Sequence, residues 1–345
     1  MRRVLDRLEP TPGQRARSAP GTGLGAAEWQ RLADTFGLPG IGIPEALGGA
    51  GGSMVEAGVV LEETGAALGP SEQLGCVVAG QALAVEPTTV VAREWLSALC
   101  GGRARIAAVV TAPEVLTAEV DGNGRRVSGD AMFVIDGATA DAFLVTAAAG
   151  GRTEALLVRS QADGVRRVPL VSVDLTRGLA QLELDGAVAE VIADDGDAFA
   201  RRLADLQTIA LGCEQVGAAG RCLDLTIAHL LRREQFGRPL GSFQALKHRC
   251  ADLVVEIESA RTTARWACAV VRDGGDIGDA ANIVGAFCGG VAVRAAAEMI
   301  QLHGGMGFTW EHDAHLYYRR ATSSQLLGGG SSVHLERVAA QVGLA

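Results

Sequence analysis

Residues 203–231 read LADLQTIALGCEQVGAAGRCLDLTIAHLL and carry a regular pattern of small and apolar side chains. From Leu203 to Leu230 these side chains recur every three or four residues, which is the period of one face of an α-helix. The stretch therefore predicts one long helix with a buried face. A helix of this length is typical of a helical bundle.

Two further long helices are predicted downstream. One covers residues 244–272, where apolar side chains from Leu246 to Val271 keep the same spacing, and the next covers residues 279–302. Two shorter helices, over 314–326 and from Ser331 onward, are separated by three consecutive glycines at 328–330. The C-terminal part is thus predicted to be a bundle of long antiparallel helices.

The regions before residue 203 show two different sequence patterns, one helical and one β-rich. Residues 26–100 show helical spacing interrupted by the turn-rich stretch GLPGIGIPEALGGAGGS at 37–53. Residues 103–194 contain short β-rich runs, such as RIAAVVTA and EALLVRS, separated by Gly, Asp and Asn. We therefore predict an α+β fold with an N-terminal helical domain over 1–101, a middle antiparallel β-barrel domain over 102–198, and a C-terminal four-helix-bundle domain over 199–345.

Composition limits the classes of function. The chain has 345 residues, of which 48% are hydrophobic and 21% charged, enough for two or three domains with their own cores. Its formal net charge of −9 argues against a sequence-independent nucleic-acid binder, which needs a basic face. We expect no membrane span and no signal peptide, and we interpret residues 1–21 as a frayed helix and loop.

Seven cysteines occur without a CxxC pair, mostly inside apolar helical patterns. In such surroundings cysteine behaves as a small hydrophobic residue. We expect reduced thiols in the core of a cytoplasmic protein.

Three segments carry a family resemblance. REQFGRPLGSFQALKH at 233–248 links the first two long helices, QLHGGMGFTWEHD at 301–313 ends the third, and HLYYRR follows at 315–320. In this order and spacing they resemble the C-terminal domain of the acyl-CoA dehydrogenase superfamily. PEALGGAGGS at 44–53 is similar to the family's N-terminal region. With the α, β, α order, the resemblance covers essentially the whole chain.

The resemblance implies FAD as the cofactor. In the family these segments hold the ADP half of an FAD whose flavin ring lies mainly on the neighbouring subunit. A pyrophosphate is bound well by a guanidinium and by closely approaching backbone N–H groups, which Arg233 and the glycine turn at 304–305 can provide. The alternative is a plain helix hairpin and a glycine C-cap. The FAD positions implied in this chain are Arg233, Gln235, Phe236, Gln244, Gln301, Gly304 and Gly305.

The catalytic base of the family is missing at its usual place. The base is a carboxylate that removes the α-proton of an acyl thioester while the β-hydrogen leaves as hydride to the flavin. The glutamate position of most relatives is Gly328 here, and the position used by a minority of relatives is Gln207. Seven residues later, on nearly the same helix face, lies Glu214 among apolar neighbours. Glu214 is therefore a candidate base, and the competing interpretation is a buried glutamate paired with an arginine such as Arg221 or Arg294.

Of the two β-domain elements that contact the flavin in the family, a loop and a strand, only the strand is similar in this chain. The loop that meets the flavin edge in relatives is degraded here to VTAPEVLT at 110–117. The strand at 132–135 resembles the family strand that flanks the flavin, so Phe133 is a candidate flavin contact. One aromatic residue in a strand is also ordinary core.

Together, the retained and lost motifs resemble the non-catalytic subunit of α2β2 acyl-CoA dehydrogenases. We expect a homologous partner subunit to supply the base and the flavin-ring site. Two alternatives stay open: a self-sufficient homo-oligomer that uses Glu214 as base, and a non-enzymatic acyl-CoA-binding or scaffold protein of the same fold. The resemblance further implies an acyl-CoA or another acyl thioester as substrate, from fatty acid or sterol side-chain metabolism, and an electron-transfer flavoprotein as electron acceptor.

Other classes of site receive little support. His303, His312 and His315 lack acidic or cysteine partners at ligand spacing, so we predict no metal site. The motifs of serine hydrolases and P-loop NTPases are not found in the sequence. The Gly40-Ile41-Gly42 element is not part of a βαβ unit, which argues against a Rossmann domain.

Overall fold

The computed structural model describes residues 23–85, 89–122 and 124–344. The expected frayed helix and loop at the start of the chain lie outside these residues. The described part begins with a helical domain whose loop at 37–53 is turned by glycines in the left-handed region. Ser53 and Glu56 form a reciprocal capping box that starts the helix after this loop. The elements are α3 (Ala26–Phe36), η1 (Leu38–Gly40), η2 (Glu45–Leu47), α4 (Met54–Ala66), α5 (Glu72–Ala84) and α6 (Val90–Cys100).

The middle domain is a sheet that closes on itself. Its strands pair in the order β1-β4-β2-β3-β7-β5, and an additional pairing of β5 with β4 completes the barrel, while β6 adds to β7. Most pairs are antiparallel as expected, but β1 and β2 both run parallel to β4. The strands are β1 (Ile106–Ala108), β2 (Leu116–Asp121), β3 (Gly124–Ile135), β4 (Ala142–Ala149), β5 (Arg152–Arg159), β6 (Val165–Pro169) and β7 (Leu179–Ala193).

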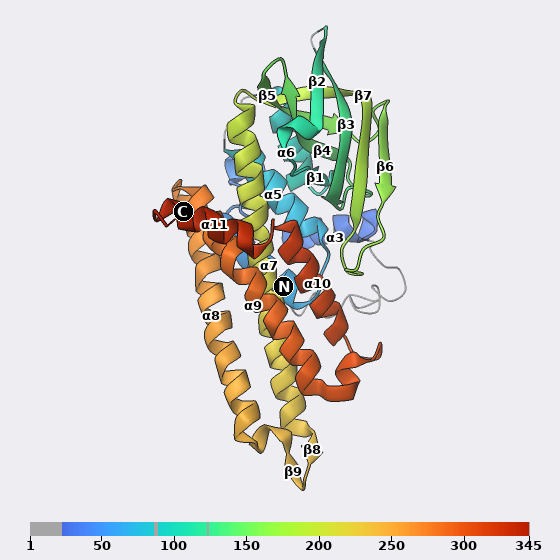
Figure 1. Ribbon diagram of the computed structural model, residues 1–345. Helices are drawn as coiled ribbons and strands as arrows, with labels where there is room; N and C mark the ends of the chain where they lie inside the picture. Colours follow the sequence, from blue (N-terminus) through green and yellow to red (C-terminus); the bar gives the residue numbers. More distant parts are fainter. Residues whose placement is uncertain (1–22, 86–88, 123, 345) are drawn as a thin grey trace.

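The C-terminal domain is a bundle of long helices below the barrel (Figure 1). Asp195 caps the N-terminus of α7, and its side chain accepts the backbone N–H of Ala198. A small hairpin, β8 and β9, projects at the far end between α7 and α8 (Figure 1). The elements are α7 (Gly196–Arg232), β8 (Glu234–Gln235), β9 (Arg238–Pro239), η4 (Leu240–Ser242), α8 (Gln244–Asp273), α9 (Ile277–His303), η5 (Gly304–Phe308), α10 (Ala314–Leu327) and α11 (Ser331–Gln341).

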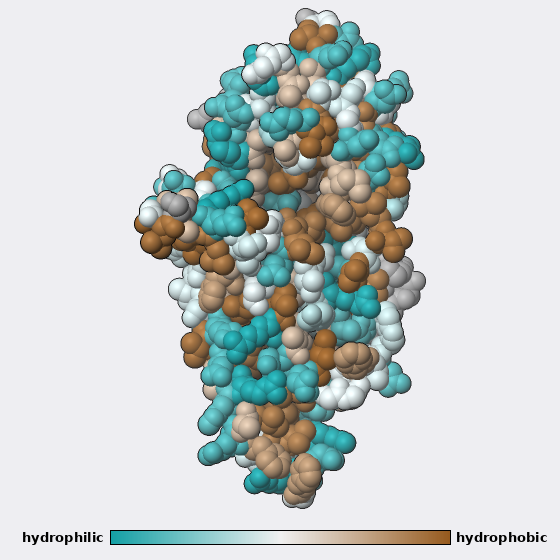
Figure 2. Space-filling view, viewed as in Figure 1, coloured by the Kyte–Doolittle hydropathy of each residue, from teal (hydrophilic) through white to brown (hydrophobic). Residues whose placement is uncertain are grey.

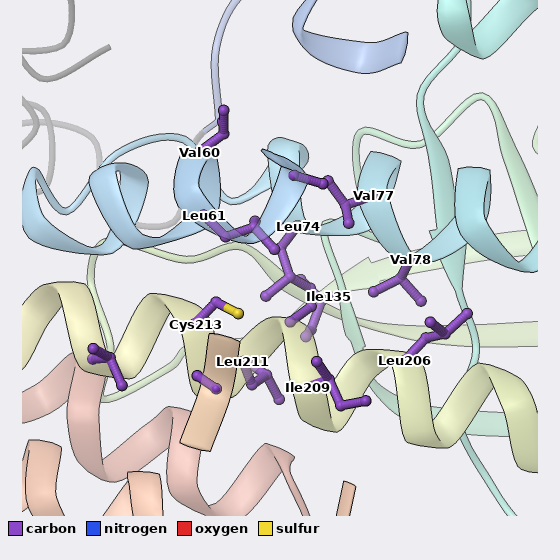
Figure 3. Close-up of a cluster of buried hydrophobic side chains, with 14 of the residues drawn as sticks. Val60, Leu61, Leu74, Val77, Val78, Ile135, Leu206, Ile209, Leu211 and Cys213 are labelled. Atoms are coloured by element: carbon purple, nitrogen blue, oxygen red, sulfur yellow. The ribbon is translucent and has the colours of Figure 1, made fainter. Parts of the chain in front are cut away.

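The middle of α7, residues 206–219, is buried on every side. Its Leu206, Ile209 and Leu211 pack against side chains of α4, α5 and β3, including Leu61 and Ile135 (Figure 3). This one helix therefore joins all three domains through a common core. The burial explains why its apolar pattern is broader than a single stripe.

Two glycines allow α4 and α7 to cross in contact. A Cβ built on Gly65 would lie 2.0 Å from the backbone oxygen of Glu214, and one on Gly217 would lie 1.8 Å from the backbone oxygen of Glu62. Neither position has room for a methyl group. The crossing fixes Glu214 deep in the interface between the N-terminal domain and the bundle.

The bundle contains one helical segment that meets the size criteria for a membrane span. Residues 277–308 contain a window with a mean hydropathy of 1.6. A segment long and apolar enough for this was not expected from the sequence. In the fold this segment is α9 with η5, and α9 packs against α7, α8, α10 and α11. Its apolar character is accounted for by its central place in the bundle.

The seven cysteines are all buried, and none of them forms a disulfide. Burial raises the pKa of the Cys76 and Cys222 thiols. Cys213 and Cys268 lie with their Sγ atoms 3.5 Å apart between α7 and α8. The thiols therefore act as core residues in this structure.

Candidate functional site

The first candidate region is the hairpin at the end of α7. Arg233 is the C-terminal cap of α7, and its carbonyl accepts the backbone N–H of Leu240, which closes the hairpin. Phe236 and Gly237, at the tip, have φ angles of 56° and 75°. Arg233, Gln235, Phe236 and Gln244 are all exposed. The predicted cofactor residues of this segment are therefore on the surface, available to a ligand or a second chain.

Phe236 is held in an unusual conformation for an aromatic residue. Its ring is 89% exposed although its backbone lies in the left-handed region, which non-glycine residues seldom adopt. The ring meets Phe243 edge-on at 6.2 Å, and the Arg238 guanidinium lies 3.9 Å from the centre of the Phe243 ring. A strained, exposed aromatic side chain is more typical of a binding site than of a core.

The hairpin end carries positive charge on an acidic protein. Residues 229–249 contain five arginine and lysine side chains against one acidic side chain, Glu234. Several of the basic side chains, including Arg232, Arg233 and Lys247, are exposed. This concentration of cations suits a diphosphate.

The glycine turn at 304–305 follows His303, whose ring stacks on His229 in the last turn of α7. Gly304 has φ 61° and ψ −141°, a combination that only glycine adopts readily. Cβ atoms built on Gly304 and Gly305 would meet nothing within 4 Å, and both residues are exposed together with Gln301. The turn thus leaves its backbone open to close approach by a ligand, as the ADP part of FAD requires.

Three histidines join the hairpin end to the glycine turn. The ring of His303 lies 4.3 Å from the ring of His229 on α7 and 4.5 Å from the ring of His312. The His303 Nδ1–H donates to the Met299 carbonyl, and burial lowers the pKa of all three imidazoles. Sequence reasoning considered these histidines only as metal ligands and missed His229. Within the described ranges, no three His, Cys, Asp or Glu side chains are grouped to hold a metal ion.

The second candidate region is an apolar cavity between the barrel and α10. Its volume is about 460 Å³. Hydrophobic surface gathers where the barrel meets the helices on the face shown in Figure 2. The cavity is lined by Phe133, Leu170, Val171, Ser172, Val173, Leu179, Thr322, Ser323, Leu326 and Leu327.

Phe133 reaches this cavity from a β-bulge. The pairing of β3 with β7 shifts register between Ala131 and Val134, so Met132 and Phe133 have no ladder partner there. Phe133 has φ 59° and is 59% exposed. Phe133 therefore lines the cavity from an irregular point of the strand, a position compatible with the predicted flavin contact. The degraded loop at 110–117 forms η3 (Pro113–Val115) and does not contribute to the lining.

Gly328 follows directly on the cavity wall at the end of α10. It has φ −78°, so its backbone is ordinary for any residue, unlike Gly329 and Gly330 with φ 94° and 80°. His334, which sequence reasoning missed, holds the turn by donating from Nε2 to the Gly328 carbonyl at 2.5 Å. No carboxylic acid is among the described residues that line the cavity.

Glu214 lies behind the cavity wall in a buried group of charges. Its Oε2 accepts hydrogen bonds from Arg177 Nη2 at 2.5 Å and from Arg320 Nη2 at 3.2 Å. Neither Arg221 nor Arg294, the partners considered from sequence, makes this pair, and Arg294 binds Glu256 instead. Gln207, the other base position considered, lies two turns earlier on α7 and does not line the cavity.

The two candidate regions are far apart. Glu214 and Arg233, the C-cap of α7, are nineteen positions apart, and at 1.5 Å per residue this is roughly 28 Å of helix. The two candidate regions of this chain are therefore separated by about half the length of α7.

Comparison with protein families matches residues 6–103 to the N-terminal domain of acyl-CoA dehydrogenase and residues 194–343 to its C-terminal domain. The chain belongs to the acyl-CoA dehydrogenase family. Members of this family are FAD-dependent oxidoreductases that act on the CH–CH bond of acyl thioesters. The fold and the enzyme class predicted from the sequence are thereby confirmed.

Individual relatives cover most of the chain. Acyl-CoA dehydrogenase IpdE2 of Mycolicibacterium smegmatis is 39% identical over 91% of this chain and 87% of its own length. A structure described as the Tcur3481-Tcur3483 steroid ACAD G363A variant has a TM-score of 0.89 at 29% identity, covering 99% of this chain and 95% of that one. The ChsE4-ChsE5 complex from Mycobacterium tuberculosis has a TM-score of 0.90 at 27% identity, covering 100% and 95%.

Proposed function

We propose that this acyl-CoA dehydrogenase chain is one subunit of an α2β2 hetero-oligomer and that it holds the ADP part of FAD. A homologous partner supplies the flavin-ring site and the catalytic carboxylate. One observation carries the proposal: the basic hairpin end keeps the family motif, while the cavity end has glycine at 328 and no carboxylic acid among the described residues of its lining.

The geometry of α7 supports a cofactor shared between chains. Arg233 and the Gly304–Gly305 turn face outward at the hairpin end, and the cavity with Phe133 lies toward the other end of the helix. A cofactor held at the hairpin can meet a flavin-ring site only on another subunit. Exposed groups at the hairpin are then covered by the partner, which accounts for the exposed ring of Phe236.

The residues of this chain have binding roles in the proposed reaction. Bound FAD supplies the hydride acceptor for the β-hydrogen of an acyl thioester. Arg233 neutralises the pyrophosphate, the Gly304–Gly305 backbone approaches it, and Phe236 packs against the cofactor or the partner. The α-proton is removed by a carboxylate of the partner.

The substrate and the electron acceptor are proposed by analogy. Two of the similar structures are described by paired subunit names, and one of them as a steroid dehydrogenase. We propose a bulky acyl-CoA, such as one derived from a sterol side chain, as the substrate. An electron-transfer flavoprotein is the proposed acceptor.

Flavin absorbance and native mass test the proposal. The chain is purified alone and again after co-expression with the homologous dehydrogenase encoded beside it. We expect a colourless chain alone and a yellow heterotetramer with about one flavin for every two chains, as a composite site shared by two subunits requires.

Other outcomes select the alternatives. Full flavin occupancy and turnover by the chain alone would overturn the proposal in favour of a self-sufficient homo-oligomer, for which Glu214 is the candidate base. Assembly with the partner but no flavin at any interface would instead indicate a non-enzymatic acyl-CoA-binding or scaffold protein.

A further inference from the structure

The loop that contains the glycine turn is closed at its two ends by histidines. We call residues 304–311 the glycine loop. His303 ends α9 just before it and His312 follows it, and the centres of their rings lie 4.5 Å apart. The loop also folds back on its first histidine, since a Cβ built on Gly307 would lie 3.1 Å from the Cβ of His303. The shape of the loop therefore depends on how these two side chains meet.

A third histidine connects the glycine loop to the end of α7. The His229 ring stacks on the His303 ring, with 4.3 Å between the ring centres and 27° between the ring planes. His229 lies one helical turn before Arg233, the C-terminal cap of α7 at which the hairpin begins. We call His229, His303 and His312 the histidine stack. The two segments proposed to hold the ADP part of FAD are joined through these three side chains.

Two hydrogen bonds determine which ring nitrogens of the stack carry protons. The Met299 carbonyl can only accept, so the His303 Nδ1 that lies 2.8 Å from it carries a proton. The Ala314 backbone N–H can only donate, so the His312 Nδ1 at 3.1 Å carries none. This second bond satisfies the first backbone N–H of α10. A charged His312 has protons on both ring nitrogens and would lose the bond.

The surroundings of the histidine stack oppose an added positive charge. Burial is the largest cause that lowers the pKa of each of the three imidazoles. On α7, Arg232 and Arg233 add positive charge beside His229. Asp313 is the negative group beside His312. Two cations against one anion leave a new proton on the stack without full compensation.

Acid should therefore weaken the closed arrangement of the loop. An imidazole whose pKa is lowered by closure binds a proton less tightly in the closed loop than in an open one. The closed loop is then favoured above about pH 6.5 and is weakened progressively below it. For one proton, the weakening is at most about tenfold for each pH unit. His315 on α10 is a further titratable side chain at this loop, with its ring edge-on to Trp310 at 4.5 Å.

We infer that His229, His303 and His312 are positioning residues, which in their uncharged form hold the glycine loop against the hairpin in the shape that binds the cofactor. The inference rests on the proposed function for its ligand. It goes beyond that function because it gives three further side chains a role and a required charge state. They act on the cofactor through the backbone of the Gly304–Gly305 turn, so acid opens the loop and releases FAD.

Hydrogen exchange of the loop backbone tests the inference without any flavin signal. The purified complex is compared at pH 7.5 and pH 5.5, and exchange in peptides covering residues 301–316 is expressed as protection relative to the intrinsic rate at each pH. We expect this protection to fall about fivefold or more at pH 5.5 in the wild type. Protection of residues 253–268, in the middle of α8, should stay constant and show that the complex remains folded.

Two substitutions remove titratable groups and keep the contacts. His229→Phe keeps an aromatic ring to stack on His303, and His312→Asn places a side-chain oxygen where Nδ1 accepts the Ala314 N–H. The double variant should therefore keep its loop protection at pH 5.5. If the double variant does not fold, His312→Asn alone should still reduce the loss of protection.

Two other histidines provide the controls. His248→Phe removes an exposed histidine of α8 at the same end of the bundle, and His315→Phe removes the histidine that packs on Trp310. Both variants should lose loop protection at pH 5.5 as the wild type does. A loop that becomes independent of pH in His315→Phe would assign the titration to His315 and overturn the inference.

Flavin affinity connects the loop to the cofactor. FAD is titrated into the flavin-depleted complex at the same two pH values, and binding is followed by the change in flavin fluorescence. We expect the affinity to fall about fivefold or more at pH 5.5 in the wild type and to stay constant in the double variant. A higher affinity at pH 5.5 would show that charged imidazoles bind the pyrophosphate directly, and it would overturn the inference.

The two measurements separate failure of the inference from failure of the proposed function. Wild-type loop protection that is equal at both pH values, or a loss at pH 5.5 that persists in the double variant, would overturn the inference. An acid-sensitive loop with unchanged flavin affinity would overturn it as well. An acid-sensitive loop in a complex that binds no flavin at either pH would instead contradict the proposed function, while supporting the role of the histidines in the loop.

Discussion

The two ends of the functional region use charge in opposite ways. At the hairpin end, arginines such as Arg233 are exposed and largely unopposed, ready for an anion that comes from outside the chain. Behind the cavity, Arg177 and Arg320 are buried and fully opposed by carboxylates of the same chain. In the proposed function, arginine thus serves recognition at one end and holds the fold together at the other, and burial decides which.

The largest difference between the ends should appear in stability. Arg177→Met leaves Glu214 and Asp174 short of a buried cation, so we expect a loss of about 3–5 kcal/mol in the free energy of unfolding. Arg232→Met at the exposed hairpin end should change it by no more than about 0.5 kcal/mol. Urea unfolding of both variants makes the measurement. An equal loss of unfolding free energy in the two variants would show that buried and exposed arginines contribute alike.

Flavin binding should show the reverse order. Arg233→Ala removes a guanidinium from the proposed pyrophosphate site, and we expect flavin affinity in the complex to fall by about 10- to 100-fold. The free energy of unfolding should hardly change. Flavin absorbance after gel filtration at a series of FAD concentrations measures the loss, with Arg232→Ala as the neighbouring control. A normal flavin content in Arg233→Ala would assign the hairpin a purely structural role.

The buried end should also respond to pH, because Asp136 lies close to its charged side chains. Burial, and next the charge of Glu72, raise the pKa of Asp136 to about 7, against the opposing effects of the Ser71 hydroxyl, Arg177 and Arg320. Because the folded state holds this proton more tightly than the unfolded state, the stabilising contribution is complete below about pH 4 and is lost as pH rises to about 7.

Asp136→Asn should remove this pH dependence. Asparagine tolerates the left-handed φ of 53° and still accepts the Ser71 hydroxyl, so the variant should match wild type near pH 4. At pH 8 it should be more stable by on the order of 1–3 kcal/mol. Thermal unfolding across this range makes the comparison, and parallel profiles for the two proteins would contradict the expectation.

The smallest effects are expected at the glycine turn after α10. A Cβ on Gly328 would meet its nearest neighbour at 3.5 Å, an ordinary contact, so Gly328→Ala should change the unfolding free energy by less than about 0.5 kcal/mol. Gly329→Ala forces a methyl group onto a residue with φ 94° and should cost about 1–2 kcal/mol. Urea unfolding of the two variants measures the cost. An equal loss of unfolding free energy at both positions would show that the backbone conformation at 328 also requires glycine.

Local periodicity was sufficient to predict most of the helices. The predicted helix at 244–272 is α8 (Gln244–Asp273), and the one at 279–302 is α9 (Ile277–His303). In contrast, the start of α5 at Glu72 has no apolar signal in the sequence, because its first turn buries the polar side chains of Glu72 and Gln73. The parallel pairing of β1 with β4 also has no local signal.

The partners of Glu214 lay beyond sequence reasoning. Arg177 is 37 residues away and Arg320 is 106 residues away, so only the closed fold brings them together. The burial of Glu214 could be read from its apolar neighbours, but the identity of its counter-ions could not. That Arg233, Gln235 and Phe236 lie together was easier to predict, since they form one continuous motif, and their cofactor role stays a prediction.

The ordinary backbone at Gly328 has an evolutionary consequence. Some glycine codons differ from glutamate codons by a single nucleotide, and the fold places no steric or conformational barrier at this position. A lineage carrying this chain could therefore regain a carboxylate at the cavity in one mutational step. In the proposed hetero-oligomer, the division of roles between subunits would then be reversible by a single mutation.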